Sequence, residues 1–476
     1  MTTTDRAHSD STNPPATNRS RRDFLQRSAA AVGSAALAGA FGAFLSRASF
    51  AAARGPSPEY GALLPLKDET TGLELLQLPE GFRYRSFGWR GDAMSDGTPT
   101  PAAHDGMAVI AAHGGCLTLC RNHEVSRVGR PFGPEAMTFD SKAMGGCAHL
   151  EFDAARGEWL SSRPSLAGTL KNCAGGPTPW GSWLSCEETV LTPGDVNGET
   201  VFDLEHEHGW IFEVPAGKPA TAAPLKDMGR FVHEAVAVDP ETGSVYETED
   251  RGTSGFYRFV PNVAGDLARG GRLFMLKVEG RPDLRKSLHV GDAFDVTWVP
   301  IDDPYRAHSP GTTDQLGVYH QGKSAGASTF ARLEGCWYGN KRIYVVSTSG
   351  GNASEGQVWQ YDPRTEQLKL LFESPDAQVL DSPDNIAVSP RGGIVLCEDG
   401  KQEPQRLHGL TPDGRLFPFA ANNVVLNGER NQIAGDFRGS EWAGATFSPD
   451  GEWLFVNIQR PGITFAITGP WRDGGL

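Results

Sequence analysis

The sequence is poor in charged residues and lacks the usual spacings of cysteine or histidine zinc sites. Charged residues make up 21% of the 476 residues and apolar residues 39%, a composition that can bury a core and differs from that of a disordered chain. No C-x-x-C pair and no H-x3-H spacing occurs, which argues against a structural zinc site.

Basic residues are also scarce, with 44 Lys and Arg against 58 Asp and Glu and a net charge of −14. Residues 1–53 hold six Arg and three Asp, a net charge of +3, which leaves −17 for the rest of the chain. Nucleic-acid binding is driven by Lys and Arg contacts to phosphates, so we expect no nucleic-acid partner. An acidic body suits cation binding instead.

Glycine and proline are abundant, at 58 and 33 residues. Without a collagen period, they indicate many tight turns between short strands. The cysteine count of seven is odd, so at least one thiol stays unpaired in a monomer, and a dense disulfide framework is not expected. The abundance of glycine and proline also argues against long helical solenoids and coiled coils.

The N-terminus has the features of an export signal. Ser20-Arg21-Arg22-Asp23-Phe24-Leu25 is a twin-arginine signature, residues 28–46 are uncharged but only weakly apolar, and Ala51-Ala52-Ala53 fits a cleavage site. We therefore expect residues 1–53 to be a twin-arginine signal peptide with a disordered N-terminus, without a stable membrane span. The twin-arginine translocase would then be a partner during export, and the folded protein would be periplasmic or secreted. An N-terminal anchor helix is the alternative.

One pattern recurs through residues 54–476, which we expect to form one domain. Each unit begins with a polar residue, continues through two apolar stretches separated by a Gly- or Pro-containing turn, and ends with polar residues. The units span residues 105–124, 173–188, 234–250, 334–348, 384–399 and 441–457. This length fits a β-hairpin, whose two ends lie on the same side of the sheet. Six such units with room for two outer strands each predict an all-β fold, a six-bladed β-propeller.

In that fold the polar ends of the hairpins converge at one mouth of the central channel. The residues expected there are Asp105, Glu124, Cys173, Glu187, Glu188, Glu234, Glu249, Asp250, Glu334, Asp384, Glu398 and Asp399. Clustered carboxylates repel and resist burial unless cations neutralise them, so the set predicts a multinuclear metal site. Carboxylates suit calcium, and a thiolate attracts a softer transition metal. The alternative is that these acidic residues only cap turns.

Several of these segments resemble the PhoX family of secreted alkaline phosphatases. The motifs are Asn172-Cys173, Cys186-Glu187-Glu188, His233-Glu234, Thr248-Glu249-Asp250-Arg251, Arg332-Leu333-Glu334-Gly335, Ser382-Pro383-Asp384-Asn385 and Cys397-Glu398-Asp399-Gly400. The resemblance covers about residues 58–472. It implies a six-bladed propeller, twin-arginine export, and a site with two ferric ions, several calcium ions and a bridging oxo group.

The resemblance also assigns roles to individual residues. Cys173, Glu249 and Glu334 match the iron ligands, and Arg332 would hold the substrate phosphate. Glu249 and Glu334 would thus be catalytic together with Arg332. The further candidates for metal or supporting ligands are Asn122, Glu124, Glu188, Glu234, Asp250, Asp384, Asn385, Glu398 and Asp399.

The implied reaction is the hydrolysis of small phosphate esters by a metal-held oxo or hydroxide group, with no Ser or Thr nucleophile, in a monomeric enzyme. Cations and an arginine fork neutralise the phosphoryl oxygens in such a reaction. Two alternatives stay open: a calcium-dependent lactonase-type propeller, which would not need Cys173 or Arg332, and a metal-loaded propeller without activity. The segment 317–324 satisfies G-x4-G-K-[ST], but the turn-like residues before it argue against a P-loop.

Overall fold

The computed structural model describes residues 59–197 and 200–476. The expected export signal, residues 1–53, lies outside the described residues. Strands dominate the described part, which has one α-helix, α2 (Gly317–Ser324), and four short 3-10 helices, Glu135–Met137, Lys226–Met228, Leu267–Arg269 and Trp471–Asp473. In the same residues, no helix has the length and apolar character that a membrane crossing needs.

The strands of the unit Ser57–Leu476 form five large antiparallel sheets and two small ribbons. The first sheet holds β4 (His104–His113), β5 (Cys116–His123), β6 (Gly145–Asp153) and β7 (Glu158–Thr169). The second holds β8 (Asn172–Pro177), β9 (Ser182–Glu187) and β12 (Ile211–Pro215).

The third sheet has nine strands. They are β13 (His233–Val238), β14 (Val245–Glu249), β15 (Phe256–Pro261), β16 (Gly271–Val278), β17 (Ala293–Pro300), β21 (Gln367–Glu373), β20 (Gln357–Asp362), β19 (Arg342–Ser347) and β18 (Leu333–Gly339). The fourth sheet holds β22 (Pro383–Val388), β23 (Ile394–Glu398), β24 (Arg406–Leu410), β25 (Leu416–Asn422), β2 (Leu76–Leu78) and β1 (Leu64–Leu66). The fifth holds β28 (Trp442–Phe447), β29 (Leu454–Ile458), β30 (Ile463–Thr468) and β3 (Arg83–Phe87). The ribbons pair β10 (Val196–Asn197) with β11 (Thr200–Val201), and β26 (Val425–Asn427) with β27 (Ala434–Asp436).

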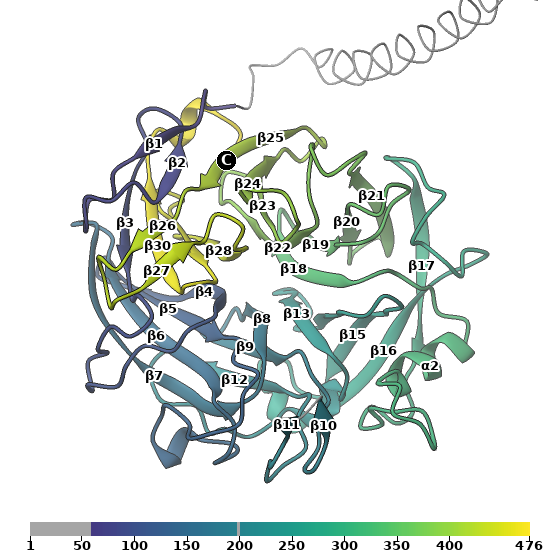
Figure 1. Ribbon diagram of the computed structural model, residues 1–476. Helices are drawn as coiled ribbons and strands as arrows, with labels where there is room; N and C mark the ends of the chain where they lie inside the picture. Colours follow the sequence, from purple (N-terminus) through teal and green to yellow (C-terminus); the bar gives the residue numbers. More distant parts are fainter. Residues whose placement is uncertain (1–58, 198–199) are drawn as a thin grey trace, which may run out of the picture. The chain divides into compact units, whose positions relative to one another are not determined.

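The sheets are arranged around one axis in a propeller-like ring (Figure 1). The innermost strands contact each other in the order β4, β8, β13, β18, β22 and β28, and β28 returns to β4. Strand β3, from the N-terminal side, pairs with β30 from the C-terminal end and so ties the two ends of the ring together. The predicted all-β, propeller-like fold is confirmed.

The sequence predicts six sheets of four strands each, but the strands do not separate in this way. The edge strand β17 pairs with β21 through Ala293–Asp295 and Gln367–Lys369, and this pairing joins two groups of strands into the nine-stranded sheet. The reason is local: the strand β17 is long enough to extend past β16 and reach the edge of the next group of strands.

Large aromatic side chains fill the space between neighbouring sheets. Trp183, Trp359 and Trp442 are among the largest fully buried side chains, as expected for rings that bury a large apolar area. The innermost strands are mostly buried, and β13 and β28 are buried along their whole length. This packing fixes the inner strands, and therefore the side chains at their ends, in a rigid frame.

The segment with the P-loop-like sequence forms the helix α2. A phosphate-binding P-loop is an extended glycine-rich loop that precedes a helix, so this geometry agrees with the sequence argument against that function. All seven cysteines are free thiols.

Candidate metal centre

The six innermost hairpins share one irregularity at the same end. In each hairpin the register shifts near the start of the first strand, as in β13 between His233 and Val236. Equivalent shifts occur in β4, β8, β18, β22 and β28. A β-bulge re-aims a side chain and is frequent next to active sites.

The first residue inside the bulge carries the metal-ligand chemistry in five of the six hairpins. These residues are Asp105, Cys173, Glu234, Glu334 and Asp384, whereas the sixth hairpin has Gly444 there. The residue that directly follows the second strand of each hairpin lies at the same end. These residues are Glu124, Glu188, Asp250, Thr348, Asp399 and Gln459.

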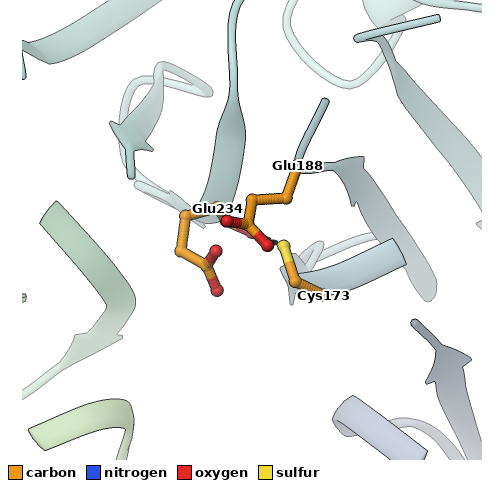
Figure 2. A group of neighbouring side chains, drawn as sticks. All are labelled: Cys173, Glu188 and Glu234. Atoms are coloured by element: carbon orange, nitrogen blue, oxygen red, sulfur yellow. Dashed lines mark hydrogen bonds between the residues drawn. The ribbon is translucent and has the colours of Figure 1, made fainter. Parts of the chain in front are cut away.

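Eight carboxylates and one thiol converge here in four overlapping groups, within each of which the ligand atoms lie within 4.8 Å of one another. The groups are Cys173, Glu188 and Glu234; Asp105, Glu124 and Glu441; Glu234, Glu334 and Asp384; and Asp384, Asp399 and Glu441. We call this set the acidic cup. Figure 2 shows the first group, with the carboxylates of Glu188 and Glu234 beside the sulfur of Cys173.

The protonation equilibria of the cup show how unfavourable this assembly is without cations. Burial raises the pKa of Glu188 to about 8, helped by Asp250 and Glu124 and opposed by Lys171. Burial, with repulsion from Asp399, raises the pKa of Asp384 to about 7. The pKa values of Asp105, Glu234, Glu334 and Glu441 are raised in the same way, by burial and by neighbouring carboxylates.

Two basic residues, Lys171 and Arg332, occupy equivalent places at the rim of the cup. Each directly precedes an innermost strand and has a left-handed backbone, with φ of 52° and 45°. Lys171 Nζ lies 2.5 Å from Glu188 and 3.8 Å from Glu124. Ala103 before β4 and Ser382 before β22 have the same backbone conformation, each with φ of 51°, so it belongs to the repeated hairpin. Lys171 and Arg332 alone cannot balance the eight carboxyl groups of the cup.

The structure does not bring Glu187, Glu249 or Glu398 into the cup. Each is the last residue of a strand, and because side chains alternate along a strand, each faces away from the residue that follows it. Glu249 accepts hydrogen bonds from Gly255 N (2.9 Å) and Tyr257 Oη (2.8 Å). The carboxylate of Glu398 is bound by Arg406 and His408.

Glu187 has a similar supporting position, where it accepts hydrogen bonds from His208 Nδ1 (2.6 Å) and Gly209 N (2.8 Å). In each case it is the residue that follows, Glu188, Asp250 or Asp399, that lies on the inward side. Of these three, Asp250 lies outside the four groups but pairs with Arg332.

The two asparagines among the expected ligands hold the backbone of the cup. Asn122 donates to the carbonyl oxygens of Cys173 (3.2 Å) and Ala174 (2.8 Å). Its side-chain oxygen accepts from Trp183 Nε1 at 2.9 Å. Asn385 donates to Asp384 Oδ1 at 2.9 Å and accepts from Gly444 N at 2.9 Å. Both amides position ligands through these bonds.

Sequence reasoning misses Glu441, Lys171 and Gln459. In the sequence analysis Glu441 is only the start of the sixth hairpin. Gln459 lies at the cup because its Nε2 donates to Glu124 Oε2 at 2.6 Å. A signal for Lys171 is present: it stands two residues before Cys173, just as Arg332 stands two residues before Glu334.

The donor set fits cations by its chemistry. Carboxylate oxygens are the preferred ligands of calcium, and the single thiol adds a softer donor that favours a transition metal. Burial raises the pKa of the Cys173 thiol, with Glu234 contributing, and a bound cation would favour its thiolate. Glu188, Glu234 and Cys173 form the group in which both kinds of donor meet.

Comparison with known proteins places this geometry in context. Residues 59–462 match the family model described as alkaline phosphatase PhoX. Among solved structures, Pseudomonas fluorescens PhoX in complex with vanadate, a transition state analogue, matches with a TM-score of 0.62 and 18% identity, over 88% of this chain and 99% of that chain. XC5397, a gluconolactonase from Xanthomonas campestris, matches with a TM-score of 0.40 and 12% identity, over 88% and 99% of the two chains. No curated protein sequence matches significantly.

Proposed function

Since the chain belongs to the PhoX family of alkaline phosphatases and is a metal-dependent phosphatase, we propose that it hydrolyses small phosphate monoesters at the acidic cup. The observation that carries this assignment of the site is the convergence of eight carboxylates and one thiol in four overlapping groups. Their pKa values are raised by burial and by neighbouring carboxylates, and bound cations would offset both effects.

We propose that the cup holds two ferric ions and several calcium ions. The group that contains Cys173 would take iron because it supplies the only thiol in these groups. The groups made only of carboxylates would take calcium. When bound, these cations neutralise phosphoryl oxygens and lower the pKa of an attacking water.

Arg332 is the residue best placed to bind the substrate phosphate. Its Nε and Nη2 bind the carboxylate of Asp250, and Nη2 also contacts Glu334. Among the described residues Nη1 makes no hydrogen bond, and the side chain is 37% exposed. The guanidinium therefore keeps donors for a phosphoryl oxygen while two carboxylates fix its orientation.

Asp250 and Glu334 raise the pKa of Arg332, as Glu188 raises the pKa of Lys171. Burial opposes the charge of each base, but the adjacent carboxylates raise both pKa values. Both side chains therefore stay protonated and can stabilise negative charge on a phosphate as the ester bond breaks. The hydrogen bonds from Asn122 to the Cys173 carbonyl oxygen and from Asn385 to Asp384 Oδ1 keep Cys173 and Asp384 in place during this step.

Three further features belong to the same proposal. The nine-stranded sheet counts as two blades, because the six bulged hairpins repeat one structural unit, so the domain 54–476 is a six-bladed propeller. Residues 1–53 act as a twin-arginine signal, and the mature enzyme works in the periplasm or outside the cell. The enzyme acts as a monomer.

The test is an assay of p-nitrophenyl phosphate hydrolysis before and after removal of metals with a chelator. The proposal expects activity in the purified protein, its loss on chelation, and its return when iron and calcium are added. Activity that survives complete metal removal would refute it.

A further inference from the structure

A large cavity opens beside the acidic cup. It has a volume of about 1170 Å³, slightly more than the roughly 300–1,000 Å³ of typical small-molecule sites. Its lining includes Glu124, which also belongs to the cup. A molecule in this cavity would therefore lie next to Glu124 at the edge of the cup.

Four arginines line the cavity: Arg90, Arg127, Arg130 and Arg460. We call it the arginine pocket. All four residues are exposed, and none of them forms an ion pair within the described residues, whereas most other arginines there are paired with a carboxylate, for example Arg430 with Asp92. In a protein with a net charge of −14, four unpaired guanidinium groups around one cavity point to an anionic ligand.

The walls between the arginines are of mixed character, with polar residues that include Asp96 and Glu124 and a set of apolar side chains. Phe132 and Phe437 line the cavity together with several prolines. Aromatic rings bind the organic part of a ligand by stacking, and guanidinium groups bind phosphate through paired hydrogen bonds. The combination suits an organic phosphate better than a free inorganic ion.

We propose that the arginine pocket holds the leaving group of phosphomonoesters whose alcohol part carries a second phosphate. This inference rests on the proposed function, because the scissile phosphate must lie in the cup. In the reaction water adds to phosphorus, the ester P–O bond breaks, and the alcohol takes up a proton and leaves with its remaining phosphate. The acidic rim would repel that second phosphate, and the four guanidinium groups offset this repulsion.

Arg460 links the pocket to the cup. It lines the pocket together with Glu124 and directly follows Gln459, whose Nε2 donates a hydrogen bond to Glu124 Oε2 at 2.6 Å. Arg127 and Arg130 lie farther along the chain from the cup, in the segment after Glu124. They are therefore the better positions for testing recognition of the leaving group apart from metal binding.

The experiment compares two nucleotides that differ by one phosphate, adenosine 5′-monophosphate and adenosine 3′,5′-bisphosphate. We expect the metal-loaded protein to hydrolyse the bisphosphate with at least a tenfold higher kcat/KM, well above the twofold gain that a second ester group gives by number alone. The double variant R127Q/R130Q should reduce this preference to about twofold. A variant that removes an exposed arginine already paired with a carboxylate, R438Q (paired with Asp436), should keep the preference.

A preference that is absent in the wild type, or that persists in R127Q/R130Q, would overturn the inference while leaving the phosphatase activity in place. An equal loss in R438Q would also overturn it, because a general effect of surface charge would then suffice. Hydrolysis of p-nitrophenyl phosphate but of neither nucleotide would also overturn the inference. If the protein hydrolyses none of the three esters, the proposed function fails, and calorimetry then tests ligand binding in the pocket. At least tenfold weaker binding of the bisphosphate to R127Q/R130Q than to wild type supports the pocket, and equal binding refutes it.

Discussion

Arg332 holds Asp250 in a forked ion pair at the rim of the acidic cup. Arg332 Nε lies 2.9 Å from Oδ1 of Asp250, and Nη2 lies 3.3 Å from Oδ2. The same Nη2 lies 2.5 Å from Glu334 Oε1. This geometry fixes the plane of the guanidinium, which a lysine at the same position could not reproduce because its ammonium is a single point charge.

The substitution Arg332→Lys should lower kcat/KM for p-nitrophenyl phosphate by about 10- to 100-fold. A hydrogen bond to a charged group contributes roughly 1.5–3 kcal/mol, and each 1.4 kcal/mol is a factor of about ten. Metal content, measured by elemental analysis, should not change. The matched control is Arg364→Lys on the outer side of the fold, where the arginine pairs with Asp362. Equal activity of the two variants would contradict this role of Arg332.

The consecutive residues Glu249 and Asp250 should behave differently when each is converted to its amide. Asp250→Asn removes the carboxylate that orients Arg332 and should lower kcat/KM at least tenfold. Glu249→Gln keeps the shape of a side chain bonded to Gly255 and Tyr257, and should lower the free energy of unfolding by about 1–3 kcal/mol without loss of bound metal. Loss of iron in Glu249→Gln would instead support the assignment of Glu249 as a ligand from the family resemblance.

Removal of the thiol in the cup should change the metal content selectively. In Cys173→Ala we expect iron to be lost and calcium to be retained, because the remaining ligands are carboxylates. The control is Cys120→Ala, which removes a thiol that is equally buried but lies in the core between sheets. Elemental analysis of both proteins decides the matter, and full iron occupancy in Cys173→Ala would argue against the thiol as a ligand.

Calcium binding should weaken as the pH falls from 8 to 6. In the groups made only of carboxylates, the pKa of Asp384 is raised to about 7, and those of Asp105 and Glu441 are raised as well, so these carboxyl groups take up protons as the pH falls. Calcium must displace these protons, so the affinity should fall by up to tenfold per pH unit for each proton displaced. Titration calorimetry in buffers of different ionisation enthalpy measures the release. The same affinity at pH 6 and pH 8 would exclude these carboxylates as ligands.

His208 should make the fold less stable as the pH rises, whereas calcium binding weakens as the pH falls. Burial opposes its charge, but Glu187 and Asp140 outweigh this and raise its pKa to about 9. A raised histidine pKa stabilises the fold fully below about pH 6.5, and the stabilisation, about 3 kcal/mol, is lost as the pH rises through 9. The gap in unfolding free energy between wild type and His208→Gln should therefore narrow between pH 6.5 and 9.5. A gap that is constant with pH would contradict a charged His208.

The positions of the bulged hairpins could be predicted from the sequence because each carries the same order of polar end, apolar stretch and turn. Cys173, Glu188, Glu234, Glu334, Asp384 and Asp399 are the expected residues that the structure brings into the four groups, together with Glu124 and the expected channel residue Asp105. The sequence does not show which of two consecutive acidic residues at a strand end faces the cup. Glu249 and Asp250 are both acidic, and only the register of the strand decides which one faces inward.

Other parts depend on contacts that a sequence pattern does not contain. The pairing of β17 with β21 joins segments more than seventy residues apart. The ion pair between Lys171 and Glu188 also depends on how two strands meet. Glu441 lies one residue before its strand rather than inside the bulge, so its position in the cup follows from the closed ring.

The most direct test of the central claim is X-ray diffraction from crystals of the purified protein at wavelengths on both sides of the iron absorption edge. We expect an anomalous iron peak within bonding distance of Cys173 Sγ, and weaker peaks from calcium among the carboxylates of Asp105, Glu124, Glu441, Asp384 and Asp399. Crystals of a protein that hydrolyses phosphate esters but shows no such peaks in the cup would contradict it.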